Sequence, residues 1–319
     1  MNVSLIKCTS IACAVALSLA TSSVANAGGT GSGYSFTEIL VPSIGPLGLV
    51  IGINDNDQVA VNNADGSKSG IYRKGIFTPL APPPAGYSNV GATGINNSGA
   101  IVGGAFPPSD PTHQQGFILI GSKYTFFSRP GWDNTAGRAI SNSGLITGFN
   151  YNGAGNVPNP DLSTTAGFIY NPVTKTFTDA TPPGSGTGFS TTQGMNASGR
   201  ISGDGRLPDG SGRYAFVWQL GTLGNDGHQL APFLAKFSIG ENGSAARGIN
   251  DAGLIVGFLN SGGGFVGNES RGFILVVPPG GDTAGAFAGC FGINNFRHVV
   301  CEVTDALGNN RAFIGTPND

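Results

Sequence analysis

Short apolar runs alternate with polar turns along most of the chain, and one version of this pattern recurs six times. Each copy ends an apolar run with a small residue and then Ile or Met, followed by a turn rich in Asn, Ser, Asp and Gly and by a second apolar run. The Ile or Met positions are Ile53, Ile95, Ile140, Met195, Ile249 and Ile293, at spacings of 42, 45, 55, 54 and 44 residues. Periods of this size indicate stacked supersecondary units, none of which buries its apolar face alone.

Each unit divides into four predicted strands. The first ends at the Ile or Met, a turn such as Asn96-Asn97-Ser98-Gly99 follows, and a second apolar strand comes next. The third strand carries a small residue before an aromatic residue or Ile, and the fourth is rich in Thr. The third-strand pairs are Gly70-Ile71, Gly116-Phe117, Gly167-Phe168, Ala215-Phe216, Gly272-Phe273 and Ala312-Phe313. Four antiparallel strands at this period predict propeller blades, although the fifth unit shows no fourth strand before Pro278.

Residue size along the unit favours a propeller over a linear β-solenoid. The residue before the Ile or Met is Gly in five copies and Ala in the third. Blades converge on the axis of a propeller, so small residues fit there, while the wider space farther out suits the Phe of the third strand.

The two ends of the chain predict how the ring closes. The sixth unit has three strands and ends without its fourth, whereas Tyr34–Pro42 resembles a fourth strand without the preceding three. Pairing Tyr34–Pro42 with Arg311–Ile314 removes two exposed edges. We therefore predict an all-β, six-bladed β-propeller whose last blade is closed by the N-terminal strand.

Residues 1–27 have the features of an export signal. Lys7 precedes a mostly apolar stretch, and an A-x-A cleavage site ends at Ala27. We expect a signal peptide at 1–27, a Gly-rich linker at 28–33 and a single propeller domain at 34–319. The protein is expected to be secreted, either extracellular or periplasmic, without membrane insertion, because no segment reaches about 18 uninterrupted apolar residues.

The charge of the chain argues against nucleic acid and anionic lipid as partners. Without its signal the chain has 15 Lys and Arg against 18 Asp and Glu, and only 11% of all residues are charged. Such a surface has no electrostatic reason to bind nucleic acid or anionic lipid. Low charge with 54 Gly in 319 residues fits a turn-rich exported β protein, expected to be a monomer.

Cys290 and Cys301 remain after removal of the signal. They lie on the first and second predicted strands of the sixth unit and flank a turn at Asn295-Phe296. Counting back from this turn places them opposite each other or one residue apart, and export favours a disulfide between them.

These units resemble the extracellular HAF-repeat family, whose repeats carry G-I-N-x-x-G-x-I-V-G followed by His-Ala-Phe. The resemblance covers residues 50 to 315 and implies export and a propeller-like repeat, with no catalytic residues to carry over. The chain departs from the family at the His. The residues in its place are Ser69, Gln115, Ala166, Tyr214, Arg271 and Arg311.

Unequal connections indicate which face binds a ligand. The connections between second and third strands and between blades are long, and in a four-stranded meander both fall on the same face. Aromatic residues on the inter-blade links are Tyr87, Trp132, Phe189, Phe237 and Phe287. They either stack on a sugar or anchor the links to the blades, and Trp132 beside Asp133 is the best candidate for the first role.

Arg138 and Arg247 share a repeat position, two residues before the Ile. They either form an anion-binding site in the channel, since guanidinium groups recognise carboxylate and phosphate, or bond to carbonyls between blades. Arg271 and Arg311 are also interpreted as equivalent. The Asn after the Ile is expected to bond its own turn. Asn54-Asp55-Asn56-Asp57 is similar to a calcium loop but lacks the Gly and Glu of an EF-hand, so no metal site is predicted and calcium remains an alternative.

Little in the sequence favours an enzyme. The six first strands contain no carboxylate, and neither G-x-S-x-G nor H-E-x-x-H occurs. A hydrolase or lyase needs acids from the loops, for example Asp110, Asp161, Asp204 and Asp226, and His113 and His228 could meet across the funnel. The leading hypothesis is a secreted non-catalytic propeller that binds a glycan or cell-surface component through its long-loop face. An extracellular enzyme and a structural protein-interaction scaffold are the alternatives.

Overall fold

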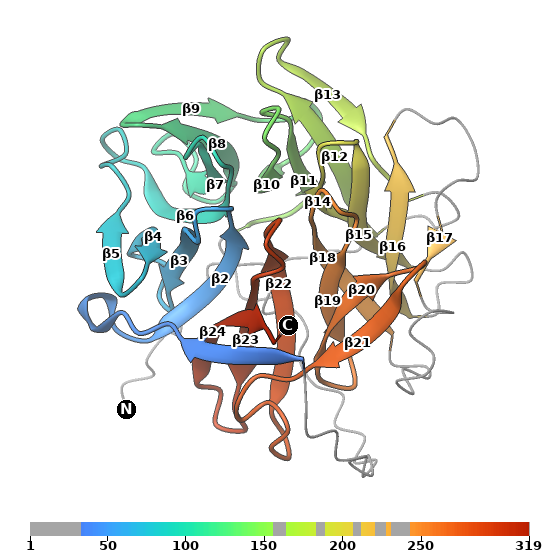
Figure 1. Ribbon diagram of the computed structural model, residues 1–319. Helices are drawn as coiled ribbons and strands as arrows, with labels where there is room; N and C mark the ends of the chain where they lie inside the picture. Colours follow the sequence, from blue (N-terminus) through green and yellow to red (C-terminus); the bar gives the residue numbers. More distant parts are fainter. Residues whose placement is uncertain are drawn as a thin grey trace.

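The structure is a ring of six four-stranded antiparallel sheets around a common axis (Figure 1). This computed structural model describes residues 33–155, 164–182, 189–206, 212–220, 228–230 and 243–318 of the chain. Five sheets contain strands that follow one another in sequence, and the sixth includes the N-terminal strand. The predicted six-bladed β-propeller is confirmed.

The blades are numbered in chain order. Blade 1 contains β2 (Leu47–Ile53), β3 (Val59–Asn63), β4 (Ser69–Arg73) and β5 (Ile76–Pro79). Blade 2 contains β6 (Ser88–Ile95), β7 (Ile101–Phe106), β8 (Gln115–Ile120) and β9 (Lys123–Phe127). Blade 3 contains β10 (Asn134–Ile140), β11 (Ile146–Tyr151), β12 (Thr165–Asn171) and β13 (Thr176–Asp179). Blade 4 contains β14 (Ser190–Met195), β15 (Arg200–Arg206), β16 (Arg213–Gln219) and β17 (His228–Gln229). Blade 5 contains β18 (Ser244–Ile249), β19 (Ile255–Leu259), β20 (Gly264–Asn268) and β21 (Gly272–Val276). Blade 6 contains β22 (Phe287–Ile293), β23 (Val299–Thr304), β24 (Asn310–Pro317) and β1 (Tyr34–Glu38).

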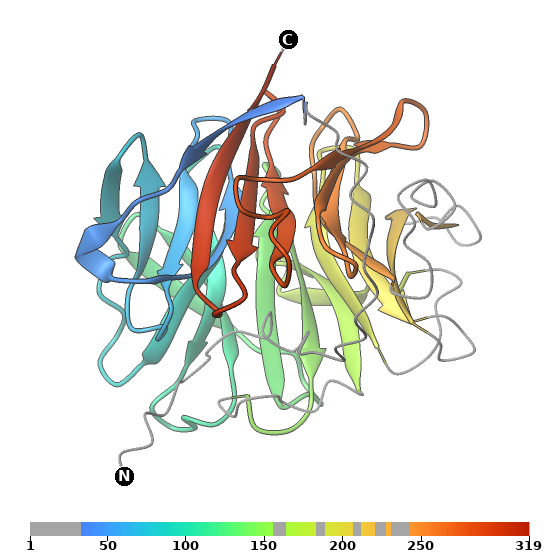
Figure 2. The same ribbon diagram turned by 90° about the horizontal axis from the view of Figure 1, so that it is seen from below.

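The strands run between two unlike faces of the ring (Figure 2). The short-turn face carries the turns that join first to second and third to fourth strands, and the long-loop face carries the other connections. Each first strand runs toward the short-turn face, because it ends at its Gly-Ile-Asn turn or the equivalent.

Blade 6 is closed by the N-terminal strand, as predicted. β1 pairs antiparallel with β24 from Tyr34 opposite Pro317 to Glu38 opposite Phe313. The carboxylate of Glu38 accepts two hydrogen bonds of 2.8 Å from the guanidinium of Arg311. The strand ends earlier than the predicted Pro42, and the chain then forms the short 3-10 helix η2 (Pro42–Ile44).

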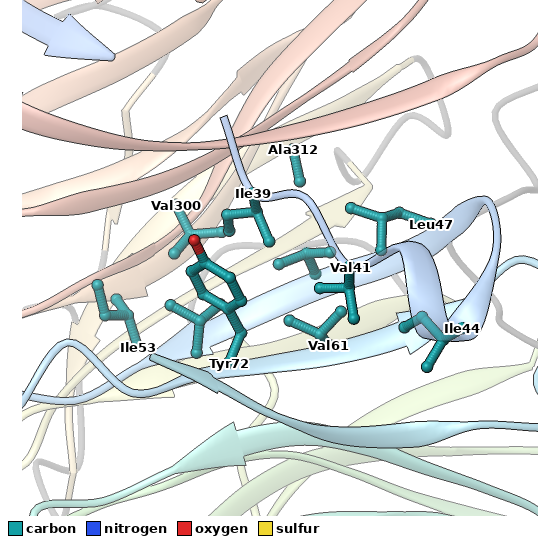
Figure 3. Close-up of a cluster of buried hydrophobic side chains, with 11 residues drawn as sticks. Ile39, Val41, Ile44, Leu47, Ile53, Val61, Tyr72, Val300 and Ala312 are labelled. Atoms are coloured by element: carbon teal, nitrogen blue, oxygen red, sulfur yellow. The ribbon is translucent and has the colours of Figure 1, made fainter. Parts of the chain in front are cut away.

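The segment after β1 joins blade 6 to blade 1 through a buried apolar cluster (Figure 3). Ile39, Val41 and Ile44 pack against residues of β2, β3 and β4 and against two residues of blade 6, Val300 and Ala312. Ile39 is 1% exposed, and its N–H donates to the carbonyl of Ala312 at 2.8 Å. The N-terminal segment therefore closes the ring by side-chain packing as well as by strand pairing.

The predicted disulfide is present on the inner two strands of blade 6. Cys290 and Cys301 lie directly opposite each other on β22 and β23 and are joined by a disulfide, with their Cα atoms 3.9 Å apart. Both residues are fully buried. The bond therefore links the first two strands of the blade that closes the ring.

Blade 5 differs from the sequence-based assignment. Gly272-Phe273 lies on the fourth strand, β21, and the third strand is β20, which carries its own pair, Gly264-Phe265. Blade 5 therefore has four strands. It follows that Arg271 and Arg311 are not equivalent, because Gly263 precedes the small–aromatic pair of blade 5.

Small residues allow the inner strands to meet at the axis, as predicted. A Cβ atom added to Gly52 of β2 would lie 2.7 Å from Cα of Gly94 on β6, and one added to Gly292 of β22 would lie 2.2 Å from the carbonyl oxygen of Ile51. Farther from the axis, the third-strand rings fill the space. They are at most 2% exposed and comprise Phe117, Phe168, Phe216, Phe265 and Phe313.

The Asn residues of the inner turns bond their own turn, as predicted, and also bond the next blade. Oδ1 of Asn96 accepts from the N–H groups of Ser98 and Ala100 within the turn. Its Nδ2 donates to the carbonyl of Ser141 in blade 3 at 3.1 Å. Equivalent bonds run from Asn54, Asn196, Asn250 and Asn294, each to the following blade around the ring.

The residue that follows this Asn in the turn forms a second set of hydrogen bonds between blades. The N–H of Asn97 donates to Oδ1 of Asn142 at 3.0 Å, and four other pairs of neighbouring blades form the same bond. The described residues of blades 3 and 4 form neither bond with each other, because Ser141 has no amide and Ala197 has no side-chain acceptor. We call the junction of blades 3 and 4 the 3–4 seam; its described residues lack both of the turn hydrogen bonds that join the other neighbouring blades.

Several sequence-based predictions lie outside the described residues. The expected signal peptide, 28–32 of the expected linker, Phe237, Asp161 and Asp226 belong to this group. Within the part of the chain that the structure describes, no helix is long and apolar enough to cross a membrane.

Candidate functional site

A β-bulge in each inner strand turns one side chain toward the axis. In β10, Gly137 pairs with Gly148 and Ala139 pairs with Thr147, so Arg138 is the extra residue between them. The inner strands of blades 2, 4, 5 and 6 shift register in the same way, and β2 shifts between Val50 and Ile53. Bulges of this kind re-aim side chains and are frequent next to functional sites.

These bulge residues line an axial cavity of about 100 Å³ together with the small residues and the Ile or Met residues that follow them. The bulge layer comprises Ile51, Thr93, Arg138, Gln193, Arg247 and Phe291. Blades 2 to 5 contribute polar side chains to this layer, whereas blades 6 and 1 contribute Phe291 and Ile51. The cavity therefore has a polar side and an apolar side.

The polar side is one connected hydrogen-bond network across blades 3 to 5. Nε of Arg138 donates to Oε1 of Gln193 at 2.9 Å, and Nε2 of Gln193 donates to Oγ1 of Thr191 at 2.8 Å. Thr191 donates to Oδ1 of Asp204 at 2.6 Å, and an N–H of Arg247 donates to the same oxygen at 3.1 Å. The two arginines thus bond to side chains, and the expected bonds to inter-blade carbonyls are not their described contacts.

Asp204 is the central acceptor of this network. It lies on β15 and is fully buried, so its predicted place on a loop is wrong. A second guanidinium, that of Arg213 on β16, bonds its other oxygen. Burial alone would raise the pKa of Asp204, but Arg213, Arg247 and the hydroxyl of Thr191 hold it below its usual value, so the carboxylate is ionised at neutral pH.

Burial lowers the pKa of both axial arginines. Arg138 and Arg247 are 6% and 7% exposed. Burial lowers the pKa of Arg138 to about 10 and that of Arg247 to about 9, and Asp204 opposes the shift in both cases. Glu302, buried on β23 and bonded by the N–H of Val50, also favours the charged form of Arg138. Both arginines are charged at neutral pH in a low-dielectric environment.

The aromatic residues on the inter-blade links pack against the blades. Tyr87 stacks on Phe126 of β9 with ring centroids 4.0 Å apart. Phe189 is 6% exposed and lies under the guanidinium of Arg213 at 4.8 Å, and Phe287 packs edge-on against Phe258. These contacts anchor the links, which is one of the two roles considered for them.

Trp132 and Asp133 lie together in the link between β9 and β10. Trp132 is half-buried and Asp133 is exposed. Asp133 accepts the N–H of Gly153 at 2.8 Å and donates its own N–H to Asn152, so it joins this link to the connection after β11. Trp132 is therefore held on the long-loop face without being buried.

The described loop residues do not assemble a catalytic pair. Hydrogen bonds from Thr112 and His113 lower the pKa of Asp110 to about 2, so this acid is ionised at neutral pH and is a poor proton donor. His113 bonds Asp110 within the same loop at 2.7 Å. His228 lies on β17, the outermost strand of blade 4, so the expected meeting of the two histidines across the funnel is wrong.

The Asn54–Asp57 turn makes protein contacts in the structure. Asp55 accepts from Asn97 and Asn295 of the two neighbouring blades, and Asp57 accepts from His298 at 2.7 Å. Among the described residues, no group of three or more His, Cys, Asp or Glu is placed to hold a metal ion.

Sequence reasoning missed four polar residues around the axis, namely Thr191, Gln193, Arg213 and Glu302. Gln193 occupies the same repeat position as Arg138 and Arg247, so aligning the six repeats position by position would have found it. Glu302 lies on a second strand, where an isolated acidic residue in an apolar run was the available signal.

Comparisons with known proteins support the fold. No protein family model and no curated protein sequence matches the chain. Among solved structures, a gluconolactonase from Xanthomonas campestris has 11% identity and a TM-score of 0.50 over 88% of this chain and 94% of its own. A protein provisionally described as a gluconolactonase has 11% identity and a TM-score of 0.49 over 89% and 92%. A virginiamycin B lyase from Staphylococcus aureus has 9% identity and a TM-score of 0.43 over 88% of both chains. At these identities the likeness concerns the fold and carries no activity to this chain.

Proposed function

We propose that this protein is an exported, non-catalytic binding propeller that takes a glycan or another surface component on its long-loop face. The observation that carries this proposal is Trp132, which the Asp133–Gly153 contact holds on the long-loop face without burying it. The axial cavity supports ligand binding separately, since its lining consists of the last three residues of each inner strand and lies at the short-turn end of the channel. Sites with a few convergent polar groups in an otherwise apolar pocket are typical of ligand binding.

The two candidate catalytic acids that the structure describes, Asp110 and Asp204, favour binding over hydrolysis. A glycosidase needs one carboxyl group that is protonated at neutral pH, and the pKa values of Asp110 and Asp204 are both lowered. Asp204 is also fully buried and bonded by two arginines.

The disulfide supports export, because such bonds persist in oxidising compartments outside the cytosol. Membership of the HAF-repeat family is part of the same proposal, and the Gly-Ile-Asn turns that link neighbouring blades support it.

A glycan-array screen of the purified protein tests the proposal. We expect binding to a defined glycan class and a loss of about fivefold or more in affinity for Trp132→Ala, since a stacked aromatic residue contributes about 1 kcal/mol. Phe296→Ala is the matched control, because Phe296 is 62% exposed on the short-turn face. Absence of binding, or a loss in Phe296→Ala with none in Trp132→Ala, would overturn the proposal.

A further inference from the structure

The polar side of the axial cavity contains hydrogen-bond donors without a full set of acceptors. Arg247 donates through one terminal nitrogen to Asp204, while its Nε is buried without a hydrogen-bond partner among the described residues. Arg247 is 7% exposed and lines the cavity between Gln193 of blade 4 and Phe291 of blade 6. A buried N–H group without an acceptor is costly, so an acceptor bound in the cavity would relieve this cost.

The charges around the axis leave room for one negative charge. The electrostatically coupled group consists of Arg138, Arg213, Arg247, Asp204 and Glu302. Among the residues that the structure describes, this group has three guanidinium groups and two carboxylates, an excess of one positive charge. Arg213 and Arg247 share Asp204, whereas the hydrogen bond of Arg138 goes to Gln193, a neutral side chain. A bound monoanion would balance the group without adding a surplus negative charge.

The size and lining of the cavity restrict the ligand further. A volume of about 100 Å³ is well below the 300–1,000 Å³ or so of a pocket that encloses a whole drug-sized ligand, so the cavity fits a terminal group. Guanidinium groups recognise planar carboxylates in a bidentate manner. Across the ring from Arg138 and Gln193, Phe291 and Ile51 offer apolar surface to the carbon atoms that carry such a carboxylate.

From these observations we infer that Arg138, Gln193 and Arg247 form a subsite for the carboxylate of a monoanionic ligand, whose adjoining carbon atoms lie against Phe291 and Ile51. The carboxylate belongs either to the acidic sugar of a glycan or to a free small organic acid. The cavity lies at the short-turn end of the inner strands, so this inference goes beyond the proposed function and does not rest on a ligand site on the long-loop face.

Titration calorimetry on the full protein with four probes tests the inference: acetate, galacturonate, inorganic phosphate and glucose. We expect acetate or galacturonate to bind and phosphate and glucose to give no saturable heat. Arg138→Gln should weaken carboxylate binding tenfold or more, since it removes a cavity charge that has no carboxylate as its hydrogen-bond partner. Arg73→Gln is the matched control, because it removes the same charge at an exposed residue outside both the cavity lining and the axial charges.

The outcomes separate this inference from the proposed function. Saturable acetate binding without galacturonate or glycan binding supports the subsite and overturns the glycan proposal. Binding of neutral glycans alone supports the proposed function and overturns the subsite. Equal binding of phosphate and acetate, or an equal loss in Arg73→Gln and Arg138→Gln, also overturns the subsite. If Arg138→Gln does not fold, Gln193→Leu replaces it and should weaken acetate binding while glucose remains silent.

Discussion

At the scale of single residues, the axial network depends on one buried carboxylate. Asp204 accepts hydrogen bonds from Arg213, Arg247 and Thr191 and is fully buried. Desolvation of such a group is costly, and only its bonded cations offset that cost. Without Asp204, Arg247 would be a buried cation with no described anionic partner.

Replacing Asp204 should therefore destabilise the protein strongly. We expect Asp204→Asn to lower the free energy of unfolding by about 3–5 kcal/mol, measured by urea denaturation at pH 7. The control is Asp179→Asn, because Asp179 also pairs with an arginine but its side chain is 77% exposed. Exposed pairs contribute at most about 1 kcal/mol.

The same pair of variants gives a pH test. The folded pKa of Asp204 lies below the usual 3.8, so its ionised form contributes stability above about pH 4, and this contribution is lost as the pH falls through the folded pKa. The difference in stability between wild type and Asp204→Asn should shrink in that range. An unchanged difference down to pH 2 would contradict the assignment.

At the scale of strands and turns, the six repeats use the same devices with one exception. Each inner strand has a bulge, and each inner turn bonds the following blade except at the 3–4 seam. The exception follows from two substitutions in the repeat, Ser141 in place of Asn and Ala197 in place of Asn or Asp.

Restoring the repeat at the 3–4 seam should stabilise the protein. Ser141→Asn places an amide where its equivalents donate to the next blade, and one net hydrogen bond contributes about 0.5–1.5 kcal/mol. We expect a rise of that size in the free energy of unfolding. Ser122→Asn, in the exposed turn after β8, should leave stability unchanged, and an equal rise there would contradict the explanation.

Strand identity was predictable from sequence except where two signals compete. Gly264-Phe265 and Gly272-Phe273 both have the small–aromatic pattern, and only the pairing of β20 with β19 assigns the first pair to the third strand. The bulges were not predictable, because a bulge depends on how two strands pair. Asp204 lies between Gly203 and Gly205, and glycines are typical of turns, so the local sequence does not indicate the buried strand that β15 forms here.

At the scale of the whole molecule, the N-terminal segment closes the ring through two contacts, the pairing of β1 with β24 and the apolar cluster around Ile39. The disulfide between Cys290 and Cys301 fixes the two inner strands of the blade that β1 completes. The closure was predictable because the sixth unit lacks a fourth strand and the N-terminal segment has the sequence pattern of one. The side-chain packing after Glu38 was not, since it depends on where η2 turns the chain.

Truncating the apolar cluster should weaken the closure. We expect Ile39→Ala to cost about 2–5 kcal/mol in the free energy of unfolding, because Ile39 is 1% exposed and contacts both blades 1 and 6. Hydrogen exchange should also speed up in β24, the partner of β1. The control is Leu40→Ala. Leu40 follows Ile39 in the sequence but is 64% exposed, so this variant should change the free energy of unfolding by less than about 0.5 kcal/mol. Similar losses in the two variants would show that the cluster does not hold the ring together.

The pairing of β1 with β24 also has a consequence for biosynthesis. Glu38 meets Arg311 across 273 positions of the chain, so β1 has no partner strand until β24 has been synthesised. Each of the first five blades consists of strands that are consecutive in sequence and can pair before β24 is made. Blade 6 is complete only when β1 pairs with β24. A premature stop before Asn310 should therefore yield an open, aggregation-prone molecule rather than a smaller stable one.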